Sequence, residues 1–331
     1  MRAFLERIWF GGGGGGWLLA PLEALFVVVS TLRRWSYRLH IAPAIHPGRP
    51  VVVVGNLTVG GSGKTPIIVW LANALTARGL RVGVVSRGYG GLDAGPTEVM
   101  ASSNPARVGD EPVLIARRTE ARVVIGRDRV AAAVQLAPAV DVILSDDGLQ
   151  HYRLARDLEI AVVDARRGFG NGHRLPRGPL RESIARLSSV AAVILNGEGE
   201  PGVSGIRSRL APTQLRPLHG PERLQLSDWA GRRVHAVAGI GDPERFFRTL
   251  EAGQLQVIRH PKPDHAQLTE RDVEFADGLP VVMTEKDAVK CLGFARPGMY
   301  YLEVSAAPEP VAGLALIDRI VDLVRNQKGS S

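Results

Sequence analysis

The hydrophobic pattern alternates between short, uninterrupted apolar runs and longer segments with helical spacing. The first run, VVVVG (51–55), contains four β-branched residues and predicts a strand buried on both faces. It leads into a glycine-rich turn, and apolar residues then recur at helical spacing over 68–75. Pro66 suits the first position of that helix, so the pattern predicts strand, turn and helix in direct succession.

Similar runs continue along the chain, with helical spacing between several of them. Further strands are predicted at 82–86, 122–126, 140–145, 159–165, 190–196, 235–240, 254–259, 279–284 and 299–304. In the last third, helices are predicted near 242–251, 269–277 and 309–326. Alternating strands and helices favour an α/β fold: a doubly wound, mostly parallel sheet of the P-loop NTPase type, with ligands at the carboxyl ends of its strands.

One stretch interrupts this alternation. Residues near 199–232 are rich in proline and arginine and show no clear periodicity, which indicates a boundary. A chain of 331 residues also exceeds one ordinary domain. We therefore expect a membrane-associated segment at 1–45, a P-loop domain at 46–228 and a second, smaller α/β domain at 229–331.

The segment WLLAPLEALFVVVSTL (17–32) is the most apolar part of the N-terminal region. Its sixteen residues fall short of the roughly 20 that a spanning helix needs, and they include Glu23. Aromatic residues near its ends and three arginines just after it favour a helix lying in the interface of an anionic membrane. A signal peptide and a helix packed on the protein's own core are the alternatives. The glycine run at 11–16 is expected to be a flexible link.

The composition indicates a globular protein with a basic N-terminal region. Hydrophobic residues make up 45% of the chain and charged residues 22%, and the net charge is +8. Six arginines and two glutamates precede Pro50, so half of the excess charge lies there, which suggests an anionic partner surface. The single cysteine, Cys291, excludes an internal disulfide and fits a reducing compartment.

The turn TVGGSGKT (58–65) has the residue types that bind a polyphosphate. Its glycines let the backbone approach the phosphates, and the amides that open the following helix point at the anion. Lys64 would reach the outer phosphates, and the Thr65 hydroxyl would ligate Mg²⁺. The strict pattern has glycine where Thr58 stands. A glycine-rich turn without a ligand is the alternative.

Two pairs of adjacent acids are candidates for chemistry. Asp146 and Asp147 end a predicted buried strand, where a P-loop enzyme usually places the acid that holds Mg²⁺ or its water shell. The alternative is an Asp-Asp-Gly turn that only ends the strand. Asp110 and Glu111 precede a proline and could instead cap a helix.

Two motifs of the second domain are less specific. Asp264 lies beside His265 in a proline-rich loop, where the pair could form a base relay or could simply be polar surface residues. The segment TEKDAVK (284–290) superficially resembles a guanine-specificity motif, but its lysine stands one place late, so GTP is not inferred. Glu285, Lys286 and Asp287 could simply cap the following helix.

A basic run spans 166–186. Arg177 and Arg181 could clamp an anionic group of a substrate, and Glu182 is the one acid inside the run. A solvated basic face is the alternative. Phe169 is the one aromatic residue within the run, which counts against a groove for single-stranded nucleic acid.

Several of these segments together resemble one family. In chain order they are GNLTVGGSGKTP (55–66), SRGYG (86–90), VGDEP (108–112), DDGLQH (146–151), LPRGPLRE (175–182), PDH (263–265) and TEKDAVK (284–290). They are similar to the tetraacyldisaccharide 4′-kinases, the lipid A 4′-kinases of Gram-negative envelope synthesis, and the resemblance covers nearly the whole chain. Threonine also opens the phosphate loop in that family.

The resemblance implies a reaction and its residues. The γ-phosphoryl group of ATP would pass to the 4′-hydroxyl of tetraacyldisaccharide 1-phosphate, forming lipid IVA, at the cytoplasmic face of the inner membrane. Asp110 resembles the catalytic base, assisted by His265 from the second domain, which implies domain closure on ATP. The residues implied for ATP are Thr58, Val59, Gly60, Gly61, Ser62, Gly63, Lys64 and Thr65. Those implied for Mg²⁺ are Thr65, Glu111, Asp146 and Asp147. The candidates for the acceptor are Arg177, Arg181, Glu182 and Asp264.

Two other classes of function are compatible with parts of the pattern. A soluble P-loop NTPase acting as a regulatory or assembly factor would hydrolyse ATP without a lipid acceptor, and Asp110 and His265 would then be structural. A nucleic-acid-binding module would use the basic surface, although no known recognition element stands in the sequence. We expect a lipid substrate, contact with an anionic membrane, and no nucleic-acid partner.

Overall fold

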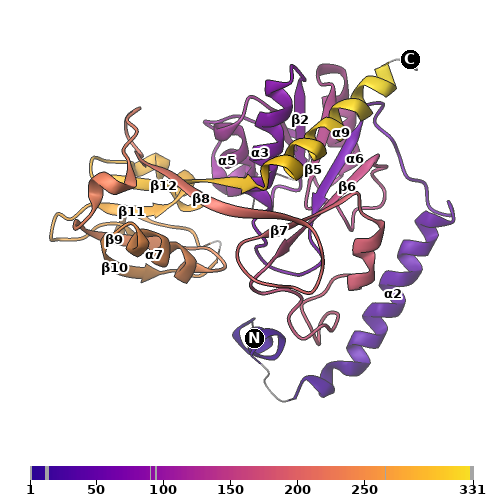
Figure 1. The fold of residues 1–331 in the computed structure, drawn as a ribbon, viewed down its shortest axis with the longest axis horizontal. Helices are drawn as coiled ribbons and strands as arrows, with labels where there is room; N and C mark the ends of the chain where they lie inside the picture. The colour runs from indigo at the N-terminus through magenta and orange to yellow at the C-terminus, as the bar shows by residue number, and fades with distance from the viewer. Residues whose placement is uncertain (1, 12–14, 90, 94, 265, 329–331) are drawn as a thin grey trace.

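The computed structural model describes residues 2–11, 15–89, 91–93, 95–264 and 266–328 (Figure 1). The strands are β1 Val51–Gly55, β2 Val82–Ser86, β3 Thr97–Val99, β4 Arg122–Ile125, β5 Val142–Asp146, β6 Leu158–Asp164, β7 Ala192–Asn196, β8 Ile206–Pro217, β9 Arg233–Ala238, β10 Gln256–Pro261, β11 Val281–Thr284 and β12 Met299–Pro308. The α-helices are α1 Arg2–Phe10, α2 Ala20–Arg38, α3 Lys64–Ala77, α4 Pro105–Val108, α5 Asp110–Arg118, α6 Arg129–Leu136, α7 Pro243–Ala252, α8 Glu285–Cys291 and α9 Pro310–Lys328. The predicted α/β class is confirmed.

Within the described residues, the strands form one twelve-stranded sheet in the order β10-β9-β11-β12-β8-β7-β6-β1-β5-β2-β4-β3. Neighbouring strands are parallel except at two places, where β8 pairs with β12 and β3 pairs with β4. The strand of the phosphate loop, β1, lies between β5 and β6 and is buried along its whole length. This explains why its four valines show no polar alternation.

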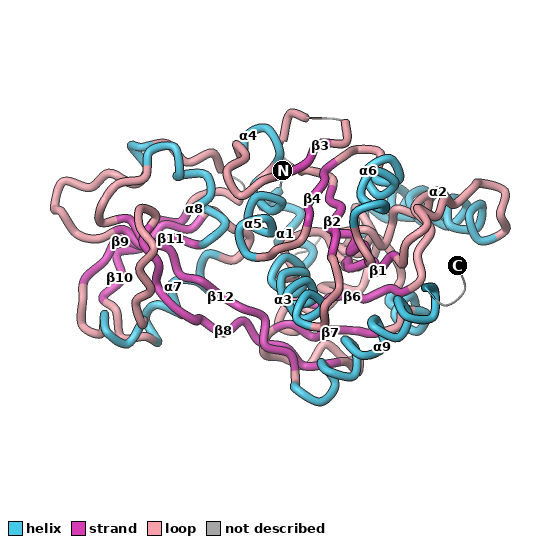
Figure 2. Tube along the Cα trace, turned by 90° about the horizontal axis from the view of Figure 1, so that it is seen from above, coloured by secondary structure: helices cyan, strands magenta, loops and turns pink. Residues whose placement is uncertain are grey.

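The β8–β12 pair joins two parts of the molecule that we name by their elements. The P-loop unit comprises β1 to β7 with α3 to α6, and the C-terminal unit comprises β9 to β11 with α7 and α8. Because β8 is parallel to β7 and antiparallel to β12, the strands of the two units run in opposite directions. Figure 2 shows β8 and β12 running from one unit to the other. The carboxyl ends of both sets of strands therefore face each other.

Alternate side chains of the central strands build two cores. Val52 and Val54 point to the face covered by α3, α5 and α9, whereas Val51 and Val53 point to the face covered by α6 and the segments after β5 and β6. Covering helices on both faces keep the parallel strands out of water, as a doubly wound sheet requires. The phosphate loop thus emerges from the most buried part of the fold.

Helix α9 packs on the P-loop unit, although it follows the last strand of the C-terminal unit. Five of its residues join the core that α3 and α5 cover: Leu316, Ile317, Ile320, Val321 and Val324. The reason is β12, whose ten residues span about 30 Å and carry the chain back along β8. The division at 1–45, 46–228 and 229–331 stays a prediction, and the structure places α9 with the P-loop unit.

One stretch holds an element that the sequence did not predict, and one predicted helix is wrong. The stretch 199–232 contains β8, a strand that the sequence hides because its side chains are mostly half-exposed or exposed and include Pro212. Pro212 pairs with Val304, where the register shifts at a bulge, a position at which a strand tolerates proline. The helix predicted at 269–277 is reduced to one 3₁₀ turn at Glu270–Asp272, closed by hydrogen bonds between Thr269 and the Asp272 carboxylate.

Helix α2 lies along the outside of the molecule (Figure 1), and none of its residues is buried. The alternative of a helix packed into the protein's own core is therefore wrong. Together with the 3₁₀ turn before it, the helix runs over Gly16–Arg38, which is long and apolar enough to cross a membrane by length and composition alone. Residues 12–14 of the preceding glycine run lie outside the described residues.

The packing of α9 predicts unequal costs for two truncations on the same helix. Ile320→Ala removes a fully buried side chain from the P-loop core and should lower the free energy of unfolding by about 2–4 kcal/mol. Leu314→Ala, at a side chain that is 55% exposed, should change it by less than about 0.5 kcal/mol. Urea denaturation of the full chain measures both values, and similar small losses would contradict the packing of α9 on this core.

Candidate active site

The phosphate loop is held open by glycines and by one asparagine from a neighbouring strand. Gly60 and Gly63 have positive φ angles of 100° and 79°, which side-chain-bearing residues rarely adopt. Asn196, the last residue of β7, donates from Nδ2 to the Ser62 carbonyl oxygen at 3.0 Å. A Cβ on Gly63 would lie 1.9 Å from that same Nδ2, so glycine is required here. Among the described residues, no atom lies within 4 Å of a Cβ built at Gly60 or Gly61.

Lys64 begins α3 directly after this loop. Its ammonium group donates to Asn56 Oδ1 at 3.2 Å and lies 3.5 Å from Asp147 Oδ1. Asp147 also accepts from Arg181 Nη1 at 3.0 Å. Burial by itself would raise the pKa of Asp147, but Lys64 and Arg181 outweigh it and hold this pKa at about 2. Asp147 is therefore ionised at any physiological pH.

Asp146 has the opposite environment, although it is the next residue along the chain. It ends β5, is 3% exposed and accepts from the Ser86 hydroxyl at 3.1 Å. Burial raises its pKa to about 6, and the nearby charge of Glu111 adds to the shift. Asp147 has φ 49°, so the Asp-Asp-Gly segment is indeed a turn that ends a strand, and the turn holds both acids beside the phosphate loop.

Asp110 and Glu111 open α5 and contact the C-terminal unit. Asp110 is buried, and its Oδ1 accepts from the Glu111 amide at 3.0 Å. Lys286 Nζ lies 3.0 Å from Glu111 Oε1 and 3.9 Å from Asp110 Oδ2. Lys290 Nζ lies 3.7 Å from Asp110 Oδ2. The structure thus brings the two acids together with Lys286, which the sequence analysis considered only as a possible helix cap, and with Lys290, to which it gave no role.

The segment 179–182 lies against the start of the phosphate loop. The Val59 amide donates to the Pro179 carbonyl at 2.8 Å, and the Arg181 amide donates to the Leu57 carbonyl at 2.6 Å. This pairing places the Arg181 side chain at Asp147. Glu182 turns the other way and is buried, accepting from Gln150 Nε2 at 2.9 Å and from the Tyr152 hydroxyl at 2.7 Å.

Arg177 points away from the phosphate loop and towards the N-terminal helices. Its Nη1 lies 3.4 Å from Glu23 Oε2 on α2. Glu23 Oε1 also accepts from the Arg174 amide at 2.8 Å and lies 3.3 Å from His173 Nδ1. The Trp9 indole on α1 donates to the Pro176 carbonyl at 2.9 Å. The basic segment after β6 is thus the surface on which α1 and α2 rest.

The loop that carries Asp264 reaches the junction between the units. A Cβ at Gly241 would lie 3.7 Å from Asp264 Oδ2 and 3.9 Å from the Gly61 amide nitrogen, so this loop and the phosphate loop are close neighbours. The charge of Asp264 also contributes to raising the pKa of Lys286. His265 lies outside the described residues, so its predicted role stays a prediction.

The residues present fit a magnesium ion bound together with phosphates. The described residues contain no group of three or more His, Cys, Asp or Glu side chains that could hold a metal by themselves. Magnesium usually takes one or two carboxylates, several waters and substrate phosphates, so a protein cage is not needed. Asp146 is a buried carboxyl whose pKa is raised next to Glu111, and a cation at this point would relieve that repulsion.

Asn196 and Ser86 are contributors that the sequence analysis missed. Both stand at the carboxyl ends of buried strands that flank the site, β7 and β2. Each is a polar residue that ends an apolar run, and this pattern could have identified them. The acid pair at the end of β5 was recognised by the same pattern. Lys286 and Lys290 carried no such signal, because their partners lie about 175 residues away in the sequence.

The geometry defines a class of protein. A glycine-rich loop follows a central parallel strand, a lysine begins the next helix, and an ionised acid just after the adjacent strand lies 3.5 Å from that lysine. This is the arrangement of P-loop proteins that bind nucleoside triphosphates.

Comparison with known proteins gives the family. A sequence model described as tetraacyldisaccharide-1-P 4′-kinase (LpxK) matches residues 16–321. A tetraacyldisaccharide 4′-kinase of Methylobacillus flagellatus is 45% identical over 98% of both chains. That of Alkalilimnicola ehrlichii is 52% identical over 88% of both chains. The chain therefore belongs to the tetraacyldisaccharide 4′-kinase family, as the ordered motifs indicated.

A solved structure agrees with this assignment. A crystal structure described as LpxK from Aquifex aeolicus in complex with ATP superposes with a TM-score of 0.79 at 26% identity. The match covers 92% of this chain and 99% of that one. The predicted fold class is confirmed by this likeness, and the alternative of a regulatory or assembly factor gains no support from the comparisons.

The raised pKa of Asp146 predicts that replacing this residue by asparagine stabilises the protein, and that the gain over the wild type depends on pH. Asp146→Asn should raise the free energy of unfolding of the metal-free protein by roughly 1–3 kcal/mol at pH 8, because it removes a buried charge. The folded-state pKa of about 6 lies above the ordinary 3.8, so wild-type stability falls as the pH rises between these values. The gain should therefore shrink as the pH is lowered towards 5.

Urea denaturation at pH 5 and pH 8 measures this effect. Asp322→Asn is a matched control, because the same substitution is then made at a carboxylate that is 69% exposed. An equal gain for Asp146→Asn at both pH values would show that relief of the buried charge is not the cause.

Proposed function

We propose that this protein transfers the γ-phosphoryl group of ATP to the 4′-hydroxyl of tetraacyldisaccharide 1-phosphate, as the names of its relatives indicate for them. One observation carries the proposal. In a chain of this family, the phosphate loop, the Asp146–Asp147 pair and the Asp110–Glu111 pair meet between two opposed sets of strand ends. Phosphoryl transfer needs this combination of a phosphate cradle, acids for a metal and a carboxylate for the attacking alcohol.

The positions of the described side chains support the roles that the resemblance implies. Residues 58–65 would cradle the phosphates, with Lys64 released from Asp147 to neutralise them. Thr65, Glu111, Asp146 and Asp147 would hold Mg²⁺, which neutralises phosphate charge when it is bound. Asp110 would orient the acceptor hydroxyl and take its proton, with His265 as its partner.

We propose that the acceptor binds on the side of the site that Arg181 and the loop carrying Asp264 form. Arg181 Nη1 lies 3.0 Å from Asp147 Oδ2. Arg177 and Glu182 are proposed to contribute to acceptor binding only indirectly. Arg177 pairs with Glu23, and Glu182 is held by Gln150 and Tyr152, so both would shape the acceptor surface indirectly.

Helix α2 is proposed to rest in the cytoplasmic face of the inner membrane of a Gram-negative bacterium. Counting from Leu18 in the preceding 3₁₀ turn, exposed apolar side chains recur at intervals of three and four residues: Leu18, Leu22, Leu25, Val29 and Leu32. Such a stripe is what an interfacial helix buries in lipid. The arginines at 33, 34 and 38 follow it and suit anionic headgroups.

Transfer of labelled γ-phosphate from ATP to tetraacyldisaccharide 1-phosphate in detergent micelles tests the reaction. The wild type should label the lipid. Lys64→Ala should abolish labelling through lost phosphate contacts, and Asp110→Asn should lower turnover by roughly 10² or more while ATP affinity is kept. The exposed Asp322→Asn should behave like the wild type. If wild type consumes ATP and leaves the lipid unlabelled, the acceptor is wrong.

Membrane contact is tested by sedimentation with vesicles that contain anionic lipid. The double variant Leu25→Asp/Val29→Asp places two charges on the exposed stripe and should weaken binding at least tenfold, since about 3 kcal/mol of apolar burial is lost. The matched control is Val311→Asp/Leu314→Asp, because these side chains are 76% and 55% exposed on α9. Equal losses from both pairs would assign the effect to net charge rather than to α2.

A further inference from the structure

We propose that the cavity between α5, α8, β8 and β12 binds a small free oxyanion with the size and charge of sulfate or phosphate. This site is additional to the proposed transfer reaction and lies apart from the phosphate loop. The residues that line it are Arg117, Arg118, Arg216, Glu285, Ala288, Val289, Leu292 and Tyr301. Glu285, Ala288 and Val289 belong to TEKDAVK, a motif that the nucleotide and metal sites leave unexplained.

The cavity is small and lies at the junction of the two units. Its volume is about 100 Å³, which is the room of roughly three water molecules. A sulfate or phosphate ion fits that space, whereas a nucleotide does not. Arg117 and Arg118 end α5, whose first residue is Asp110. At a rise of about 1.5 Å per residue, Arg118 lies about 12 Å from Asp110 along the helix axis, so the cavity is separate from the candidate active site.

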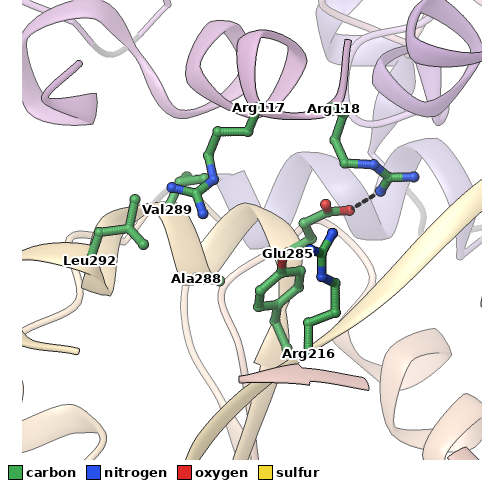
Figure 3. A pocket seen from close by; sticks show the side chains of 8 residues that line it. Arg117, Arg118, Arg216, Glu285, Ala288, Val289 and Leu292 are labelled. Atoms are coloured by element: carbon green, nitrogen blue, oxygen red, sulfur yellow. Dashed lines mark hydrogen bonds and ion pairs between the residues drawn. The ribbon is translucent and has the colours of Figure 1, made fainter. Parts of the chain in front are cut away.

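Positive charge is in excess around the cavity. In the view of Figure 3, Arg117 and Arg118 extend towards it from above and Arg216 from below. Arg118 donates to Glu285 Oε2 at 2.6 Å, and Arg216 donates to Glu303 Oε2 at 3.0 Å. The three guanidinium groups therefore face two carboxylates. Burial also raises the pKa of Glu285 to about 7, although Arg118 opposes this shift, so its negative charge is partly lost at neutral pH.

Two polar groups in the wall have hydrogen-bonding capacity to spare. Within the described residues, the Arg117 side chain makes no hydrogen bond or ion pair. The Tyr301 hydroxyl likewise has no hydrogen-bond partner in the part of the chain that the structure describes, although Tyr301 is only 9% exposed. Burial raises the pKa of Tyr301 above its ordinary value, so the hydroxyl keeps its proton and can donate. Buried tyrosine hydroxyls usually have a partner, and an oxyanion in the cavity would supply one.

The helix dipole explains only part of this arrangement. Cations are favoured in the last turn of a helix, which accounts for Arg117 and Arg118 at the end of α5. It does not account for Arg216, which comes from a strand, or for the buried hydroxyl of Tyr301. Guanidinium groups bind tetrahedral oxyanions through paired N–H donors, and such charge-assisted hydrogen bonds are stronger than neutral ones. The convergence of these donors on one cavity is what indicates an anion.

A bound anion would connect the two units. Helix α5 belongs to the P-loop unit, and β8 leads from that unit into the pairing with β12. An anion that accepts from both Arg117 and Arg216 would therefore join α5 to the linking strand. It would add to the contact that Arg118 already makes with Glu285 on α8.

Calorimetric titration of sulfate into the full chain in detergent measures this binding, at constant ionic strength and with ADP at saturation to occupy the phosphate loop. The wild type should bind a single sulfate. Arg117→Gln should weaken binding at least tenfold through the loss of a charge-assisted hydrogen bond, and Tyr301→Phe about threefold. Arg259→Gln controls for net charge, because it removes a cation from exposed pairs with Glu244 and Glu251, and it should change the affinity by less than about twofold.

Glu285→Gln tests the charge balance in the opposite direction. It removes the carboxylate that occupies Arg118, so sulfate should bind roughly threefold tighter. A damaged fold cannot produce such a gain, so this variant separates the charge of the cavity from its structural support. Selenate soaked into crystals of the protein should be located between Arg117 and Tyr301 by its anomalous scattering.

Several results would overturn the proposal. No binding to the wild type, or equal binding by wild type and Arg117→Gln, would show that the cavity holds no anion. Loss of binding in Lys64→Ala, or selenate found there, would place the ion in the phosphate loop. Glycerol 3-phosphate binding as tightly as inorganic phosphate would assign the cavity to a phosphate group of a larger molecule instead of a free ion. None of these measurements depends on phosphorylation of the lipid.

Discussion

The antiparallel pairing of β8 with β12 is the constraint on which the candidate site depends. It reverses the strand direction between the two units, so parallel strands on both sides present their carboxyl ends to one region. The phosphate loop after β1 and the acids after β5 consequently meet the helix that follows β11. Open α/β sheets place ligands at such ends, and here two sets of ends enclose the site from opposite sides.

Within that region, acids and cations are arranged so that neighbouring carboxyls differ in chemistry. Asp147 contacts Lys64 and Arg181 and has a pKa of about 2, whereas Asp146 is buried near Glu111 and has a pKa of about 6. Environment, rather than residue type, separates the two. A cation that binds between phosphates and acids would meet Asp147 already ionised. It would also relieve the electrostatic repulsion between Asp146 and Glu111.

How much the sequence could predict depended on the range of the contacts involved. The strand, the glycine turn and Lys64 are consecutive, so their pattern contained the phosphate loop, and an acid pair that ends a buried strand was recognisable in the same way. Long-range packing decided the rest. Arg177 and Glu182 were expected to bind a substrate, but Arg177 pairs with Glu23 and Glu182 with Tyr152. The strand β8 was missed because arginines and a proline occupy many of its half-exposed and exposed positions.

Glu23 gives the apolar helix a fixed orientation. A helix of apolar residues alone can roll about its axis or slide in lipid at little cost, but a carboxylate tied to His173, the Arg174 amide and Arg177 prevents both. The exposed stripe of α2 therefore always faces away from the basic segment. Under the proposed contact of α2 with a membrane, the helix itself would set the height of that segment above the surface, so α2 would act as a spacer as well as an anchor.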